Sequence, residues 1–219
     1  MGRREAYRAE LREHAKADWP GYLTEESGLP GPRANLELAQ AVADVADAQT
    51  LDELIESGDE YLVFCGVNGL SDEKRLKEHA KDDRWRVREA VAMALQRLGD
   101  KDFPGLSRIV TAWAKDGDPL VQRAAVAAVC EPRLLKSPEA AAVAIKICEI
   151  ATATLKDRRK GDGHRALRKA LGYGWSVAVA ADPAANLPVF QALQHDPDPD
   201  VRWIVTENSK KARLAKLLG

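Results

Sequence analysis

Apolar and small residues recur along the chain with the spacing of amphipathic helices. From each of five anchor residues, such residues recur three, four, seven and eight positions further on; the anchors are Leu62, Val87, Val121, Leu167 and Val201. This spacing places the residues on one face of an α-helix. Because Ala and Gly are frequent in the stripe, neighbouring helix backbones can approach each other closely. The pattern therefore predicts five closely packed inner helices.

Partner helices are predicted beside these inner helices, over residues 34–46, 50–57, 72–81, 102–115, 138–156 and 184–195. Successive anchors are 25, 34, 46 and 34 residues apart, about one two-helix repeat each. We therefore predict an all-α fold, an α-solenoid of stacked helix pairs. A single domain is expected over 1–219, with an N-terminal helix and a Pro/Gly-rich loop in 1–33 and about five helix pairs in 34–219.

Several short motifs predict where helices begin. Asp118-Pro119, Ser137-Pro138 and Asp182-Pro183 each combine an N-cap residue with proline at the first helical position. Thr50 to Glu53 has the pattern of a capping box, with Thr50 as the N-cap. These motifs agree with the helix starts that the apolar pattern predicts.

Three segments are expected to differ from the repeats. Residues 19–32 are rich in Pro and Gly and predict a loop, and the basic segment 156–164 predicts an exposed connection. The fifth stripe ends on Asn208 and Ser209, so we expect a capping repeat that faces water there.

Composition narrows the classes of function. No apolar run approaches the roughly 20 residues that cross a bilayer, and the N-terminus lacks the apolar core of a signal peptide. Three distant cysteines (Cys65, Cys130 and Cys148) argue against a disulfide framework and for packing in the core. The four histidines show no metal-ligand spacing. We predict a cytoplasmic protein with no metal, no cofactor and no membrane association.

The charge distribution is uneven, although the net charge is only −1. Residues 1–80 contain 9 Lys and Arg against 17 Asp and Glu, a formal charge of −8, whereas residues 81–219 contain 24 against 17, a formal charge of +7. A polyanion would therefore bind the C-terminal part of the chain, and a basic protein partner would bind the N-terminal part.

Two segments, Asp-x-x-Trp-Arg-Val-Arg-Glu-Ala at 82–90 and Asp-Pro-Asp-Val-Arg-Trp at 198–203, resemble the HEAT-repeat consensus. The segment Leu-Arg-Lys-Ala-Leu-Gly-Tyr-Gly-Trp at 167–175 resembles the HEAT-like bacterial DNA alkylation-repair glycosylases. The resemblance spreads over residues 34–215 and implies HEAT-like helix pairs in an ARM-type superhelix. Members of that family cradle damaged DNA in a concave face, with aromatic residues and an Asp near the lesion.

Carried onto this chain, the family's motif falls on Trp85, Glu89, Arg123 and Tyr173. Glu89 stands in place of the family's Asp, Tyr173 in place of a Trp, and Ser176 where the family has an Arg. If the activity is shared, Glu89 is the catalytic carboxylate that stabilises a developing cationic sugar. The alternative is that Glu89 belongs to an ordinary solvated helix face and pairs with a nearby base.

We predict that the inner helices together form a binding groove. It is lined by two columns of residues, two and six positions after each anchor. They contain Phe64, Asn68, Glu89, Met93, Arg123, Ala127, Lys169, Tyr173, Trp203 and Glu207. Tyr173 and Trp203 are candidates for stacking on a base, whereas Trp113 and Trp175 are expected in the core. The candidate ligand-binding residues are Trp85, Arg88, Arg123, Lys169, Tyr173, Trp203 and Lys210.

Three functions are consistent with these patterns. The favoured one is a non-catalytic binding module whose groove takes nucleic acid, with its basic side chains on phosphates. The second is a DNA glycosylase that excises alkylated bases through Glu89. The third is a protein-interaction scaffold whose acidic N-terminal part recruits a basic partner. Many unrelated functions share solenoid folds, so fold class alone does not choose among them.

Overall fold

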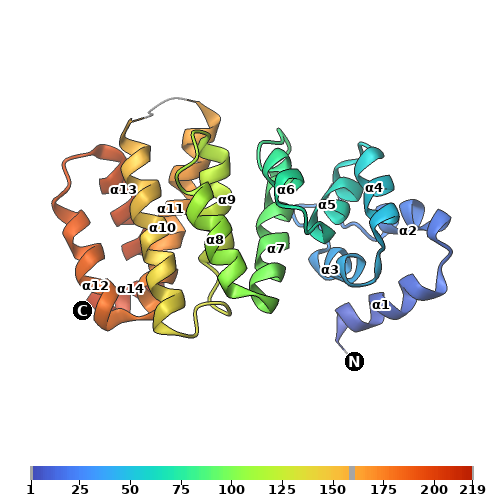
Figure 1. The fold of residues 1–219 in the computed structure, drawn as a ribbon, viewed down its shortest axis with the longest axis horizontal. Coiled ribbons are helices and arrows are strands. Elements are labelled where there is room, and N and C mark those ends of the chain that lie inside the picture. Colours follow the sequence, from blue (N-terminus) through green and yellow to red (C-terminus); the bar gives the residue numbers. More distant parts are fainter. Residues whose placement is uncertain (1, 158–160, 219) are drawn as a thin grey trace. The chain divides into compact units, whose positions relative to one another are not determined.

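The computed structural model describes residues 2–157 and 161–218, and the described chain is built from helices (Figure 1). These residues contain no β-strand, which confirms the predicted all-α class. The chain divides into two compact units, Met1–Ala94 and Leu95–Gly219, and each is described by itself. The single domain expected over 1–219 stays a prediction.

Unit 1 consists of short helices and the first part of a longer one. They are α1 (Arg3–Glu13), η1 (Lys16–Asp18), α2 (Trp19–Glu25), α3 (Leu36–Val45), α4 (Ala48–Glu56), α5 (Glu60–Gly69), α6 (Glu73–His79) and the start of α7 (Trp85–Lys101). Helix α3 packs against α1 and α5, and α5 also packs against α2 and α4. Helix α5 is therefore the centre of this unit, and its residues from 61 to 68 are buried.

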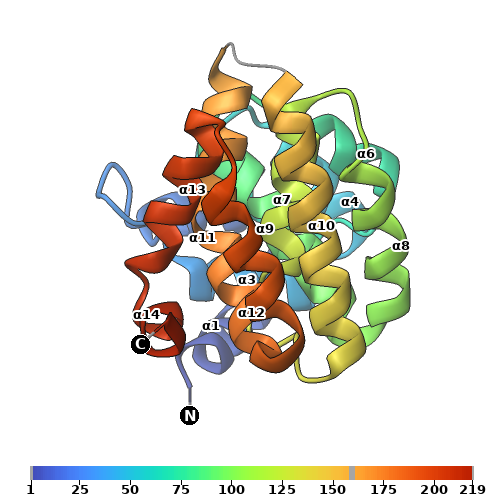
Figure 2. The ribbon, with the colours of Figure 1, turned by 90° about the vertical axis from the view of Figure 1, so that its left-hand side faces the viewer.

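Unit 2 contains the remainder of α7 and the helices that follow it. They are α8 (Phe103–Trp113), α9 (Pro119–Val129), α10 (Pro138–Asp157), α11 (Asp162–Ala181), α12 (Pro183–Ala192), η2 (Leu193–His195), α13 (Pro199–Ser209) and α14 (Ala212–Leu218). Helix α11 packs against both α9 and α13, while α10 packs against α9 and α11 (Figure 2). Helix α14 packs against α11 and α13, and α14 is an element that the apolar pattern did not predict.

The predicted apolar stripe forms the core of both units. All five anchors are buried, and in α9 every position of the stripe from Val121 to Val129 is completely enclosed. Trp113 and Trp175 are buried, as predicted for core residues. The three cysteines are free and buried, which agrees with their predicted role as small core residues. None of the described helices has the length and apolarity needed to span a membrane.

Most predicted helix starts are correct because their caps form. The side chains of Asp118, Ser137 and Asp182 accept hydrogen bonds from backbone N–H groups two or three residues further on. Thr50 is the exception, because α4 begins at Ala48 and its N-cap is Asp47. The carboxylate of Asp47 accepts hydrogen bonds from both the backbone N–H and the hydroxyl of Thr50. An acidic N-cap three residues upstream therefore takes the place of the predicted capping box.

The loop predicted over residues 19–32 is wrong for its first half, which forms α2. Trp19 and Leu23 lie one turn apart and are both buried, and the indole N–H of Trp19 donates to the carbonyl of Leu11. Pro20 lies in the first turn of α2, where the missing N–H of proline costs no helix hydrogen bond. The apolar pair thus outweighs the Pro/Gly content that suggested a loop.

The connection predicted over 156–164 is shorter than expected, since α10 extends to Asp157 and α11 begins at Asp162. Its central residues, 158–160, lie outside the described residues. Within α11, His164 is buried and its Nε2 lies 3.0 Å from Oδ2 of Asp200. Packing against α13 therefore extends α11 into a segment whose basic and Gly-containing sequence suggested an exposed loop.

Asn208 does not face water, contrary to expectation, but is completely buried. Its side-chain amide donates to the carbonyls of Leu171 and Ile204, and its Oδ1 accepts from the backbone N–H of Ser176. A polar residue in the stripe can therefore join two helices through hydrogen bonds instead of marking an exposed end.

Candidate functional site

Two of the predicted aromatic residues lie together on unit 2. Tyr173 belongs to α11 and Trp203 to the adjacent helix α13. Between them is Gly172, where an added Cβ atom would lie only 2.8 Å from Cζ3 of Trp203. The missing side chain thus lets the indole ring lie directly against the backbone of α11. Trp203 is half-buried there, and Tyr173 is its exposed neighbour.

Arg168 of α11 lies over the ring of Trp203, with Cζ 4.6 Å from the ring centroid. Its Nη1 donates to Oδ1 of Asp200 at 2.7 Å, and His164 contacts the other oxygen of that carboxylate. Burial by itself would raise the pKa of Asp200, but the hydrogen bonds from Arg168 and His164 outweigh it and hold that pKa below its usual value. The ionised carboxylate therefore keeps the guanidinium in place over the indole.

Arg213 of α14 pairs with Tyr173 in a similar way. Its Cζ lies 4.9 Å from the ring centroid, and its Nη2 donates to the tyrosine hydroxyl at 3.1 Å. The side chain of Tyr173 nevertheless remains 43% exposed, one of the most exposed large apolar side chains of the described chain. Helix α14 thus fixes the orientation of an aromatic ring that solvent still reaches.

Two exposed lysines complete this part of unit 2. Lys169 precedes Tyr173 by one helical turn, so both project from the same side of α11. Lys210 follows α13, and its Nζ lies 2.6 Å from Oε1 of Glu207. The hydrogen bond from Lys210 is the main reason why the pKa of Glu207 lies below its usual value.

We call this cluster the Tyr173–Trp203 surface. It consists of Arg168, Lys169, Tyr173, Trp203, Glu207, Lys210 and Arg213, from α11, α13, the residue after α13, and α14. Helices α11, α13 and α14 contact one another, and Figure 2 shows α14 below α13. Four of the seven side chains are cationic and one is anionic, and unit 2 as a whole carries 20 Lys and Arg against 14 Asp and Glu. The surface combines positive charge with aromatic rings, a combination suited to anionic ligands with flat groups.

No family model, no curated protein and no solved structure matches this chain. The resemblance to HEAT-repeat proteins and to the alkylation-repair glycosylases therefore stays a prediction that rests on the quoted segments alone.

Four predicted site residues lie outside this surface: Trp85, Arg88, Glu89 and Arg123. Arg123 is half-buried on α9, the helix that packs on the other side of α11, and it is engaged in interactions of its own. The other three belong to the first turns of α7 in unit 1. The motif carried over from the glycosylases is therefore divided between the two units.

Within unit 1, Trp85 is 53% exposed, and Cζ of Arg86 lies 4.6 Å from the centroid of its ring. Arg88 donates to the backbone carbonyls of Asp82 and Asp83, which ties the segment before α7 to its first turn. Glu89 is half-buried and has interaction partners. Arg88 therefore has a structural role at the start of α7, and the role of Glu89 stays a prediction.

Two predicted lining residues are wrong, because Phe64 and Asn68 lie in the core of unit 1. The amide of Asn68 donates to the carbonyl of Ala39 in α3. Helix α5 packs against α2, α3 and α4, so the side of the helix that was expected to line a groove is covered. The spacing that marks an exposed column in α11 thus marks a buried one in α5.

Sequence reasoning missed Arg168, because it directly follows the anchor Leu167 and belongs to neither lining column. Its partners Asp200 and Trp203 lie more than thirty positions away, on another helix. The apolar pattern suggests that α11 and α13 are neighbours. It does not give the register between the two helices, and without the register this contact cannot be predicted.

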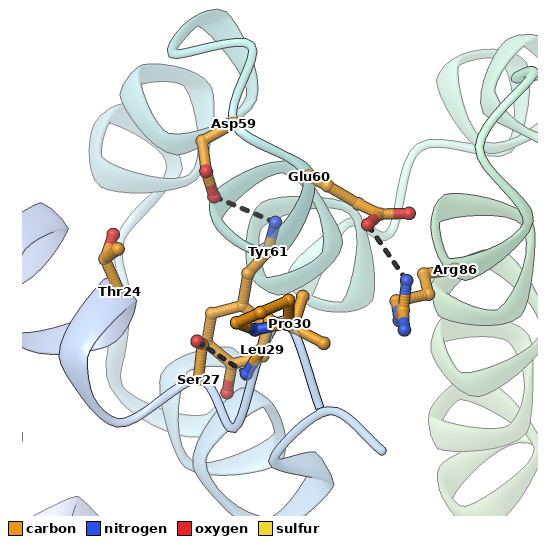
Figure 3. A pocket seen from close by; sticks show the side chains of 8 residues that line it. All are labelled: Thr24, Ser27, Leu29, Pro30, Asp59, Glu60, Tyr61 and Arg86. Atoms are coloured by element: carbon orange, nitrogen blue, oxygen red, sulfur yellow. Dashed lines mark hydrogen bonds and ion pairs between the residues drawn. The ribbon is translucent and has the colours of Figure 1, made fainter. Parts of the chain in front are cut away.

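Unit 1 contains a pocket of about 360 Å³ (Figure 3). Its lining residues are Thr24, Ser27, Leu29, Pro30, Asp59, Glu60, Tyr61 and Arg86. Glu60 pairs with Arg86 at 3.0 Å, and Asp59 caps α5 by accepting from the backbone N–H of Tyr61. Burial raises the pKa of Tyr61, whose hydroxyl donates to the carbonyl of Asn35. These polar groups support the fold, and none of these pairs joins a nucleophile to a general base.

Over the described part of the chain, no group of three His, Cys, Asp or Glu side chains is arranged to hold a metal ion. The cationic and aromatic side chains of the Tyr173–Trp203 surface are groups that can bind an anionic ligand. They offer positive charge, N–H donors and an exposed ring, in a region where the nearest carboxylates are already paired.

Proposed function

We propose that the protein is a non-catalytic binding module of the HEAT-repeat class, and that it binds nucleic acid through the Tyr173–Trp203 surface. The observation that carries the proposal is that an arginine lies over each of two aromatic rings, on α11 and α13, and that two exposed lysines lie on the same helices or directly after them. Nucleic acid offers both complementary groups, phosphates for the cations and bases for the rings.

Charge supports an anionic partner for unit 2. Unit 2 carries a formal charge of +6, whereas residues 1–94 contain 13 Lys and Arg against 20 Asp and Glu, a formal charge of −7. A polyanion is attracted to unit 2 and repelled by residues 1–94, so the charge distribution favours binding of a polyanion to unit 2. Lys169 and Lys210 are exposed, and lysine ammonium groups suit phosphate contacts that do not read sequence.

The packing of unit 2 supports the proposed solenoid. Helices α9, α11 and α13 are the inner helices that the stripe predicts, and α11 packs against each of the other two. Helix pairs stacked in this way present successive inner helices on one continuous surface. The buried free thiols agree with a reducing compartment, and we place the protein in the cytoplasm.

Fluorescence anisotropy with labelled oligonucleotides tests this function. If three or four cationic side chains contact phosphates, the logarithm of the association constant should fall with the logarithm of salt concentration with a slope of about −2 to −4. The titration uses a single strand, the matching duplex and a duplex with an alkylated base, between 50 and 200 mM salt, chosen as roughly the range over which phosphate contacts weaken.

Absence of binding at 50 mM salt would contradict the proposal, as would an affinity that does not change over roughly this range. Preferential binding of the alkylated duplex with release of the base would favour the glycosylase instead, and that activity should then disappear in Glu89→Gln.

A further inference from the structure

We infer that the ligand of the Tyr173–Trp203 surface is a single-stranded stretch of nucleic acid, and that one of its bases stacks on Tyr173. This inference rests on the proposed function and specifies its ligand. The argument depends on the different surroundings of the two aromatic rings and on the cations beside the exposed one.

The ring of Trp203 serves mainly as packing. Its Cζ3 and Cη2 atoms lie against the backbone at Gly172, so close that an added Cβ atom would be 2.8 and 3.1 Å from them. The guanidinium of Arg168 lies over the same ring and is held by Asp200. Trp203 is therefore enclosed by α11 and by Arg168, and it fixes α13 to α11 instead of offering a free face to a base.

Tyr173 also has a guanidinium over its ring, that of Arg213, but its side chain is more exposed than that of Trp203. Tyr173 belongs to a helix that packs against α9, α10 and α13, so its backbone is rigidly held. Its hydroxyl accepts a hydrogen bond from Arg213, which fixes the ring orientation. The side chain is still 43% exposed, although exposure of so large a ring to water is unfavourable. A ring that is oriented in advance loses little further conformational entropy when a base stacks on it.

The cations near Tyr173 fit a strand whose bases are unpaired. Lys169 lies one turn before Tyr173 on α11, and Arg213 contacts the ring itself. In a single strand, a splayed base and its own phosphate can reach a ring and a neighbouring cation at the same time. In a duplex the bases are stacked inside, so a duplex would use the cations and leave Tyr173 without a partner.

The test compares Tyr173→Leu with Tyr173→Phe. Leucine keeps an apolar side chain but removes the aromatic ring, whereas phenylalanine keeps the ring and loses only the hydroxyl. Wild-type protein should bind a 12-nucleotide single strand, a length of roughly one ssDNA site, more tightly than the duplex of the same length. Tyr173→Leu should weaken single-strand binding by about tenfold, since stacking on an aromatic ring contributes on that order per base. The affinity of Tyr173→Phe for the single strand should stay within about threefold of that of wild type. The affinity of both variants for the duplex should not change.

A second readout reports stacking directly. A single strand containing 2-aminopurine should change its fluorescence when it binds wild-type protein or Tyr173→Phe, and the change should be much smaller with Tyr173→Leu at saturating protein. Leu36→Ala is the control, because Leu36 is also an exposed large apolar residue but belongs to unit 1. Its affinity for the single strand should equal that of wild type.

Two results would overturn the inference. One is equal binding of single strand and duplex by wild-type protein, and the other is a Tyr173→Leu variant that binds the single strand as tightly as wild type does. Salt-sensitive binding in either case would leave the proposed function standing. Absence of binding by wild-type protein at low salt would instead remove the proposed function itself.

Discussion

Replacement of Trp175 by alanine should lower the free energy of unfolding by about 3–5 kcal/mol, as is typical of a large aromatic removed from a core. Trp175 is completely buried in α11, and its ring centroid lies 6.0 Å from that of Phe190 in α12. Its indole N–H donates to Oγ1 of Thr152 in α10 at 3.0 Å. The substitution therefore leaves a cavity between three helices and an unpaired hydroxyl. Urea denaturation followed by helix circular dichroism measures the loss.

A matched pair of phenylalanine substitutions separates packing from hydrogen bonding. Among the described residues, Nε1 of Trp113 is a buried donor without a hydrogen-bond partner, whereas Nε1 of Trp175 has Thr152. Trp175→Phe should therefore be more destabilising than Trp113→Phe, by about 1 kcal/mol. Equal losses for the two variants would show that the hydrogen bond to Thr152 adds no stability, and a loss below about 1 kcal/mol for Trp175→Ala would contradict the packing described for unit 2.

Reversing two charges of the Tyr173–Trp203 surface should have the largest effect on binding. The double variant Lys169→Glu/Lys210→Glu replaces attraction to phosphates by repulsion, so affinity should fall on the order of 100-fold at low salt. The slope of the salt dependence should become shallower by about 2, because two cation–phosphate contacts are lost. The loss of the exposed ion pair between Lys210 and Glu207 should cost little stability, since such pairs contribute about 0–1 kcal/mol.

The control variant carries the same change in net charge on another part of unit 2. Lys136 and Lys146 are exposed, the first just before α10 and the second within it, and neither belongs to the Tyr173–Trp203 surface. Lys136→Glu/Lys146→Glu should reduce affinity by only a few-fold, through the general field of the protein. If both double variants lose affinity equally, the binding depends on net charge and not on this surface.

The helices could be predicted well from the sequence because they depend on local patterns. The apolar stripe and the Asp-Pro and Ser-Pro motifs place most helices, since the N-cap of a helix is chosen by residues within one turn of it. Helix α2 was missed because its short apolar pair, Trp19 and Leu23, lies among Pro and Gly residues. The predicted role of Asn208 was wrong because its hydrogen-bond partners belong to another helix.

The candidate site could be predicted only in part. Lys169 and Tyr173 follow from helix periodicity, since an exposed column on one helix is a local property, whereas Lys210 lies outside both columns and was predicted from its charge. The enclosure of Trp203 depends on Gly172 and Arg168, two residues of another helix whose register with α13 is set by packing. The same spacing placed Phe64 in the groove, although α5 is covered by its neighbours. Periodicity therefore identifies the faces of helices but not which faces remain exposed.

The measurement that tests the central claim most directly is photo-crosslinking of a single-stranded oligonucleotide that contains 5-iodouracil, followed by mass spectrometry of the peptides. The account predicts crosslinks in α11 around Tyr173 and in the segment from α13 to α14, and their loss in Lys169→Glu/Lys210→Glu. Crosslinks confined to unit 1, or spread over unit 2 without enrichment at Tyr173, would contradict the assignment of nucleic-acid binding to the Tyr173–Trp203 surface.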